Sequence, residues 1–458
     1  MDFSASMISS TSGYVWVAPT PMVMMPAPAI EEETAVVKPT WRLYANILVA
    51  VLQALQFGWS TSQMNNSIFN NEVDCNARPI APGTCLMFPG HTKTEWTIAV
   101  SSWIVGGMIG SLLTGRVSNK FGRKPTMMAN CLFMIAGISF GRYLSSNHQL
   151  LLRGYQQRVA VHRSVPVLNA GFFLAFAPFV LVESPAWLLE KGDRERAEQE
   201  IARLYGHGFV PQALSWMEPS VNTDLESEPL SEEQQYEGGT LSLLFSPLFI
   251  KQLLVALGVS AAQQLTGINA VCYYSSDIFS DAGVSDGRVG GVIVYVLMLL
   301  PTMAVARLSE RFGNRRLLLT GLAGMFISAT GITLALALSV EVLSIVFMGT
   351  FVAFFSVSVG PLIWPITAAL FTDSVRATAV SMCIFINWVC NLIIGVFFPY
   401  VSDALDEYKF VPFMVTTAAF FFFTQFWIPE TAGKSTEEIQ ATFRPAILTS
   451  RIGQAECV

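Results

Sequence analysis

The sequence predicts an all-α protein that crosses a membrane many times, and three observations lead to this fold class. Of the 458 residues, 52% are hydrophobic and only 13% are charged, whereas soluble domains carry roughly 25% charged residues. The hydrophobic residues gather in about ten runs, each able to cross a bilayer as a helix of roughly 20 residues. The loops between the runs alternate between basic and acidic. A chain with so few charges cannot cover itself in water, so its apolar surface must face lipid.

The predicted spans follow one another from residue 43 to residue 428. They lie near 43–63, 97–114, 126–144, 165–182, 249–275, 289–306, 317–339, 342–371, 378–400 and 409–428. Residues 1–40 precede them as a disordered cytosolic tail, because no basic segment leads into an apolar core as in a signal peptide. Residues 429–458 form a second cytosolic tail.

Basic residues predict the orientation of the spans. They concentrate in the short segments GRVSNKFGRK and RLSERFGNRR and in one later loop, while the alternate loops are acidic. Positively charged loops stay in the cytosol, so both termini are expected there as well. The residues of these basic segments are Arg116, Lys120, Arg123, Lys124, Arg307, Glu310, Arg311, Arg315, Arg316 and Arg376.

The loop at 64–95 then faces outward. It contains the sequence Asn65-Asn66-Ser67, which is a candidate N-glycosylation site at Asn65. It also contains Cys75 and Cys85, which are candidates for a disulfide if the loop is extracytoplasmic. Two free thiols are the equal alternative.

A cytosolic loop at 183–248 divides the chain into a first bundle at 41–182 and a second bundle at 249–428. Its first part places apolar residues at helical spacing, which predicts amphipathic helices. Each half repeats a basic segment around Phe-Gly after its second span and ends on an acidic segment, VESPAWLL or PETAGKSTEEI. This internal repeat predicts two similar bundles that face each other.

Three amides lie inside one apolar run, in the segment AAQQLTGINAVCYYSS: Gln263, Gln264 and Asn269. Facing lipid, each would leave polar groups unpaired at roughly 1–3 kcal/mol. A straight helix would not aim all three at one ligand, so we expect a break at Thr266-Gly267. Amides suit a polyol because each donates and accepts hydrogen bonds. Hydrogen bonds between helices are the structural alternative.

Further polar and aromatic candidates lie in later spans. Asn387 and Asn391 share a helix face at i and i+4, with Trp388 beside them. Trp364 stands between Pro361 and Pro365, which predict a kinked helix. Either tryptophan could form a platform for a sugar ring or simply pack.

Several classes of function find no support in the residues. No Cys/His cluster has metal-ligand spacing, and there is no nucleophile–base arrangement and no nucleic-acid signature, so neither an enzyme nor a cofactor is expected. No predicted span contains Asp or Glu. A proton-coupled mechanism therefore lacks an intramembrane carboxylate.

The motifs GRVSNKFGRK, VESPAWLL, QQLTGINAVCYY, ERFGNRR, GPLIW, INWVCN and PETAGKSTEEI, in this order, resemble the sugar porter family of the major facilitator superfamily. The similarity is greatest to the facilitative hexose transporters. It implies two six-helix bundles with one sugar between them, in a multi-pass protein of the plasma membrane. It implies sugar contacts at Gln263, Gln264, Asn269, Trp364, Asn387, Trp388 and Asn391, and cytosolic gates at the basic segments.

The largest departure from the family lies in the first half of the chain. Between the third run and VESPAWLL the family has two more helices, and about sixty residues are missing here, so about ten spans remain. The leading hypothesis is a hexose transporter that works by facilitated diffusion. A non-transporting sugar sensor or an inactive truncated transporter is the alternative, and a proton-coupled symporter the second. The sugar and the oligomeric state stay open.

Overall fold

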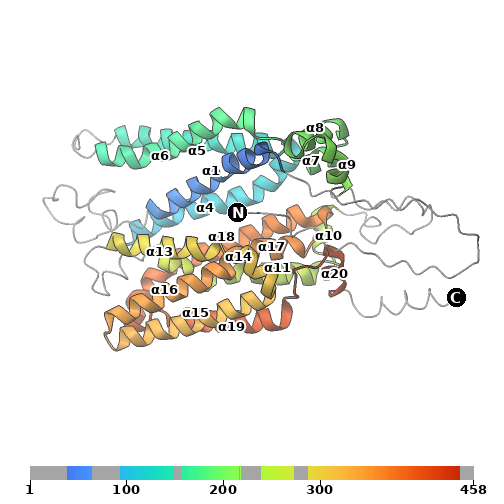
Figure 1. The fold of residues 1–458 in the computed structure, drawn as a ribbon. Helices are drawn as coiled ribbons and strands as arrows, with labels where there is room; N and C mark the ends of the chain where they lie inside the picture. Colours follow the sequence, from blue (N-terminus) through green and yellow to red (C-terminus); the bar gives the residue numbers. More distant parts are fainter. Residues whose placement is uncertain are drawn as a thin grey trace, which may run out of the picture.

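The computed structural model describes residues 39–63, 93–147, 156–215, 217, 239–272 and 287–443. All regular elements within these ranges are helices (Figure 1), which confirms the predicted all-α class. Each of the predicted runs is helical there, and the runs at 249–275, 289–306 and 342–371 are each interrupted by a break. The tail before residue 39, the sequon at Asn65 and the cysteines Cys75 and Cys85 lie outside the described residues.

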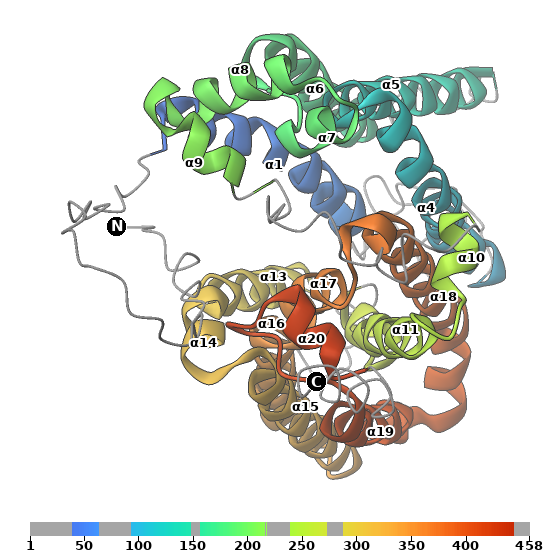
Figure 2. The same ribbon diagram turned by 90° about the vertical axis from the view of Figure 1, so that its right-hand side faces the viewer.

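Four long helices make up the first half: α1 (Trp41–Gln63), α4 (Lys93–Phe121), α5 (Arg123–Asn147) and α6 (Gln156–Val180). Helix α6 packs between α1 and α5. Their shared core includes Val49, Cys131 and Phe173. Helix α4 packs mainly against α18 of the second half, so it joins the two groups of helices seen in Figure 2.

The segment after α6 forms short helices at one end of the first-half group (Figure 1). They are α7 (Pro185–Glu190), α8 (Arg194–Tyr205), the 3₁₀ helix η2 (His207–Phe209) and α9 (Val210–Ser215). The buried residues of α8 are Ala197, Ile201 and Leu204, spaced i, i+4 and i+7 on one face. This pattern is the amphipathic helix that the sequence predicts.

The second half follows α10 (Thr240–Leu244) and contains most of the buried core. Its helices are α11 (Ile250–Leu265), α13 (Gly287–Thr302), α14 (Val305–Phe312), α15 (Asn314–Ala337), α16 (Glu341–Val357), α17 (Val359–Ala369), α18 (Asp373–Leu405), η3 (Asp406–Tyr408), α19 (Val411–Trp427) and α20 (Thr436–Ala441). Helix α15 packs against α16 and α19, and α11 packs against α18.

Four helical stretches of the described residues are long and apolar enough to cross a membrane: Ile250–Cys272, Asn314–Ala337, Val342–Ala369 and Val375–Tyr408. The bent pair Val292–Thr302 and Val305–Phe312 raises this number to five if it counts as one span. The positions of the predicted helices are thus confirmed, while the number that cross the bilayer stays a prediction.

Candidate functional site

The helix that carries the amide triplet is broken where the sequence predicts it. Helix α11 ends at Leu265, and Gly267 has a φ of +95°, a backbone conformation that costs residues with a Cβ roughly 1–2 kcal/mol. A helical turn resumes at Ile268. A Cβ on Gly267 would lie 2.5 Å from the Phe413 ring. The break therefore needs glycine for both its torsion and its tight packing.

The break turns Asn269 back toward the amides that precede it. Asn269 Nδ2 donates a hydrogen bond to Gln264 Oε1, and Gln264 Nε2 donates to Asn387 Oδ1 at 2.8 Å. Asn387 Nδ2 donates to Gln263 Oε1 at 2.8 Å and to the Ser260 carbonyl at 3.0 Å. The four amides thus form one chain that links α11 to α18.

Gln263 extends this chain to a third helix. Its Nε2 donates to the Gly360 carbonyl at 2.7 Å, in the GPLIW segment of α17. Helix α16 ends at Val357, four residues before Pro361, whose ring has no N–H for the Val357 carbonyl. The predicted kink is therefore a break between α16 and α17. Helices α11, α17 and α18 therefore meet at the amides.

The amide cluster is buried but not saturated with hydrogen bonds. Gln263, Gln264 and Asn387 are only 6–7% exposed, while Asn269 is half-buried. A primary amide offers two N–H donors and a carbonyl with two lone pairs. Gln263 and Gln264 each donate one hydrogen bond here, which leaves a second donor on each. The interhelical bonds expected as the structural alternative are present, and capacity for further partners remains.

The other predicted site residues occupy different surroundings. Asn391 is buried at 4% exposure on α18, and Trp364 is 38% exposed on α17. Trp388 packs edge-on against Trp103 of α4, with ring centroids 5.1 Å apart. The structure therefore brings Gln263, Gln264, Asn269 and Asn387 together, and it places Trp388 at the contact between the two halves.

Gly107 of α4 makes this contact possible. A Cβ on Gly107 would lie 2.6 Å from the Trp388 ring, whereas a Cβ on Gly106 meets nothing within 4 Å. Overpacking of this kind costs roughly 1–3 kcal/mol. We expect Gly107→Ala to lower the thermal stability of the purified protein by that amount, and Gly106→Ala to leave it unchanged. Equal stability of the two variants would contradict the close approach of α4 and α18.

A second group of amides lies in the first half and was not singled out from the sequence. Gln53 Nε2 donates to Cys131 Sγ at 2.8 Å and Gln53 Oε1 accepts from Asn130 at 3.1 Å. Asn169 Nδ2 donates to the Leu52 carbonyl at 2.8 Å and to Gln56 Oε1 at 3.5 Å. The same sequence pattern that singled out Gln263, an amide inside an apolar run, could have identified these residues.

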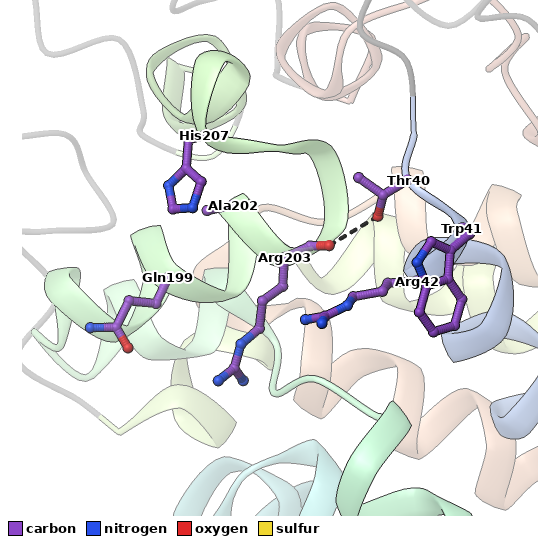
Figure 3. Close-up of a pocket in the computed structure, with 7 residues that line it drawn as sticks. All are labelled: Thr40, Trp41, Arg42, Gln199, Ala202, Arg203 and His207. Atoms are coloured by element: carbon purple, nitrogen blue, oxygen red, sulfur yellow. Dashed lines mark hydrogen bonds between the residues drawn. The ribbon is translucent and has the colours of Figure 1, made fainter.

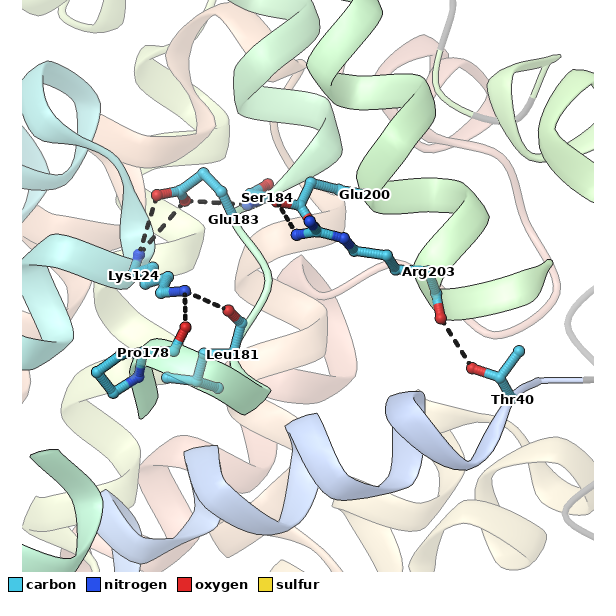
Figure 4. A network of polar contacts seen from close by, with 8 residues as sticks. All are labelled: Thr40, Lys124, Pro178, Leu181, Glu183, Ser184, Glu200 and Arg203. Carbon is cyan, nitrogen blue, oxygen red and sulfur yellow. Dashed lines mark hydrogen bonds and ion pairs between the residues drawn. The ribbon is translucent and has the colours of Figure 1, made fainter. Parts of the chain in front are cut away.

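The basic segment of the first half is fastened by a carboxylate (Figure 4). Glu183 Oε1 accepts from the backbone N–H of Arg123 at 2.7 Å and of Lys124 at 3.3 Å. These donors are unpaired within α5 because they belong to its first turn. Lys124 Nζ donates to the carbonyls of Pro178 and Leu181 at 2.9 and 2.7 Å, at the end of α6. Opposite charges therefore complement two helix termini.

The second half repeats this arrangement with different residues. Glu430 Oε1 accepts from the backbone N–H of Asn314 at 2.8 Å and of Arg315 at 3.4 Å, in the first turn of α15. Arg315 Nη2 donates to the Gln425 carbonyl near the end of α19. Gly122 and Gly313, which precede the two helices, have φ of +96° and +84°. The repeat detected in the sequence thus corresponds to a repeated structure, in which a glutamate caps the start of a helix that follows a glycine of positive φ.

Removing the Glu430 carboxylate should loosen α15. Glu430→Ala leaves several backbone donors without a partner, at a cost of about 1–3 kcal/mol in the free energy of unfolding. Glu430→Gln keeps an accepting oxygen and should cost less. Hydrogen exchange at the amides of residues 314 and 315 reports the change directly. Glu407→Ala, at an exposed position of η3, is the control, and an equal effect there would refute the cap.

The remaining basic residues lie at the surface or at a helix end. Arg376 Nε donates to the carbonyls of Ala368 and Phe371 at 3.0 and 3.1 Å, where α17 ends. Lys120 and Arg311 lie over the rings of their neighbours Phe121 and Phe312. The other residues of the two basic segments are exposed: Arg116, Arg307, Glu310 and Arg316.

Comparison with known proteins connects this architecture to a family. The family model described as sugar (and other) transporter matches residues 46–161 and 138–443. The chain belongs to this sugar transporter family. The resemblance seen in the sequence motifs is thereby confirmed, and with it the assignment to multi-pass membrane proteins. The relatives are transporters and not enzymes.

Relatives in animals extend along almost the whole chain. Solute carrier family 2, facilitated glucose transporter member 4 of Mus musculus is 32% identical over 483 residues, covering 90% of this chain and 93% of the relative. Member 1 of Gallus gallus is 30% identical over 484 residues, covering 89% and 94%. Member 4 of Homo sapiens is 31% identical over 483 residues, covering 90% and 93%.

Solved structures show the same fold at lower identity. A double-tryptophan variant of XylE has a TM-score of 0.69 at 20% identity, covering 88% of this chain and 99% of that chain. The proton:xylose symporter XylE of the major facilitator superfamily, bound to 6-bromo-6-deoxy-D-glucose, has a TM-score of 0.66 at 20% identity, covering 88% and 99%. The sugar transporter described here therefore has the major facilitator fold.

Proposed function

We propose that this chain transports a hexose such as glucose by facilitated diffusion through alternating access. One observation carries the proposal: four amides, from α11, from the helical turn after its glycine break and from α18, meet within predominantly apolar segments. Broken helices near the middle of the membrane are where transporters of this architecture bind their substrates. The mouse and chicken relatives are facilitated glucose transporters by name.

The amide cluster fits a polyol chemically. Sugar hydroxyls both donate and accept, so they replace amide–amide bonds one for one and use the spare N–H groups of Gln263 and Gln264. The sugar therefore exchanges hydrogen bonds that the amides already make and adds only those of the spare N–H groups, so the net free energy of binding stays small. A millimolar site corresponds to about −4 kcal/mol, which permits release. Trp364, Trp388 and Asn391 complete the proposed site.

Facilitated diffusion is favoured over proton coupling by the composition of the spans. None of the predicted spans contains Asp or Glu, so these spans offer no carboxylate to bind and release a proton. The resemblance to the sugar porter family implies that Ser60 stands where proton-coupled members carry an aspartate. We therefore expect uptake to be insensitive to a pH gradient across the membrane.

A non-transporting sugar sensor or inactive truncated transporter is the second candidate, and one observation favours it. The family model matches in two pieces that overlap at residues 138–161, where the sequence lacks two expected helices. The alignment with the mouse relative spans 483 positions although the chain has 458 residues, so the relative carries residues that are missing here. Such a protein would bind sugar, or nothing, without flux.

Uptake of labelled glucose by transporter-null cells that express this chain distinguishes the two candidates. Saturable uptake, at equal rates with and without an imposed pH gradient, supports facilitated diffusion. Sugar binding by the purified protein without uptake supports the sensor, and neither binding nor uptake supports the inactive form. We also propose that the protein lies in the plasma membrane with both termini in the cytosol. The basic segments would act as gates, and domains would begin at residues 41, 183, 249 and 429.

A further inference from the structure

A cavity of about 440 Å³ lies between the start of α1 and the end of α8 (Figure 3). Its lining residues are Thr40, Trp41, Arg42, Gln199, Ala202, Arg203 and His207. Two guanidinium groups and an imidazole therefore face one space, while none of the lining side chains is acidic. None of the lining residues belongs to the amide cluster or to either carboxylate-capped helix end.

The two elements around the cavity are held together by Thr40. The backbone N–H of Thr40 donates to the Leu204 carbonyl at 2.9 Å. Its Oγ1 donates to the carbonyls of Arg203 and Leu204 at 2.9 and 2.8 Å. The end of α8 is thus capped by the residue before α1, and this contact fixes the relative position of Arg42 and Arg203.

The charges in the cavity are only partly neutralised by the protein. Arg203 Nη1 lies 3.0 Å from a carboxylate oxygen of Glu200 on the same helix, and its side chain is still 53% exposed. Arg42 lies over the Trp41 ring at 5.9 Å and has no carboxylate partner within the described residues. Figure 3 shows the Arg42 side chain extending from α1 toward the side of Arg203, which extends from α8. An anion placed between them would relieve their repulsion.

The position of the cavity selects the kind of anion. Helix α1 is apolar from its first turns onward, and Trp41 at its start is 71% exposed, as tryptophans are where a membrane helix meets the headgroups. Guanidinium groups bind phosphate through paired N–H donors. We propose that Arg42, Arg203 and His207 form a binding site for a phosphate-bearing anion. An anionic lipid headgroup and a soluble phosphate compound are its two sources.

Thermal stability of the purified full-length protein in neutral detergent tests the site. Short-chain phosphatidylserine is titrated in one arm and inorganic phosphate in the other, and each apparent affinity is read from the rise in Tm. We expect the double variant Arg42→Gln, Arg203→Gln to weaken binding about 30-fold, which converts to about 2 kcal/mol. The arm that responds identifies the source.

Two further variants separate binding from folding. Glu200→Gln removes the carboxylate that competes for Arg203 and should tighten binding severalfold, a gain that a damaged fold cannot produce. Arg194→Gln removes a similar ion pair of α8, with Glu198 at 3.0 Å, outside the cavity and should leave binding unchanged. A flat response in both arms, unchanged affinity of the double variant, or an equal loss in Arg194→Gln overturns the proposal.

Discussion

Replacing Gln264 with alanine should reduce glucose uptake by about 10- to 100-fold without lowering the amount of protein in the membrane. Gln264 links Asn269 to Asn387, so its loss removes a proposed sugar contact and leaves buried amides unpaired, at about 1–3 kcal/mol. The measurement is initial uptake of labelled glucose, normalised to transporter labelled at the cell surface.

The control for this variant removes a hydrogen bond elsewhere in the second half. Ser328 Oγ and Thr350 Oγ1 lie 3.0 Å apart between α15 and α16, and Ser328 is buried. Ser328→Ala should change uptake less than threefold, because it removes a polar contact without touching the amide cluster. Wild-type uptake by Gln264→Ala would show that the amide cluster is structural only.

Gly267→Ala should be among the most damaging single substitutions in the chain. Its φ of +95° is unfavourable for alanine, and the new methyl group would lie 2.5 Å from the Phe413 ring. Together these effects cost about 2–5 kcal/mol. We expect a large fall in Tm and loss of glucose binding, because Asn269 can no longer turn back to Gln264.

Gly192→Ala separates the two causes. Gly192 also has a positive φ, of +79°, but a Cβ there meets nothing within 4 Å. Its substitution should therefore cost only the conformational part, about 1–2 kcal/mol. If Gly267→Ala and Gly192→Ala lower the stability equally, the contact with Phe413 contributes nothing. The inference that the break at Gly267 is tightly packed would then be wrong.

The break at Gly267 illustrates what the sequence predicts well. Three amides cannot point to one place on a straight helix, and the nearest residue that allows a turn is Gly267. The same reasoning from Pro361 gave the break between α16 and α17. Helix positions followed from apolar runs, since each run is long enough to form a helix on its own. Local rules were sufficient in all these cases.

Other features depend on contacts between distant segments and could not be derived in this way. The sequence leaves open whether Trp388 forms a platform for sugar or packs, and only the folded chain places its ring against Trp103 and Gly107 of α4. The mutual hydrogen bonds of Gln263 and Asn387 need the relative rotation of α11 and α18. The basic segments suggested gates, but only the folded chain reveals Glu183 and Glu430 as caps of α5 and α15.

Counterflow in liposomes is the most direct test of the claim that the amides bind a sugar and pass it across the membrane. The purified chain is reconstituted, the vesicles are loaded with unlabelled D-glucose, and labelled D-glucose is added outside without a pH gradient. The proposed mechanism predicts transient accumulation of label above equilibrium, absent for L-glucose and for Gln264→Ala. Entry of D-glucose at the rate of protein-free vesicles would contradict it.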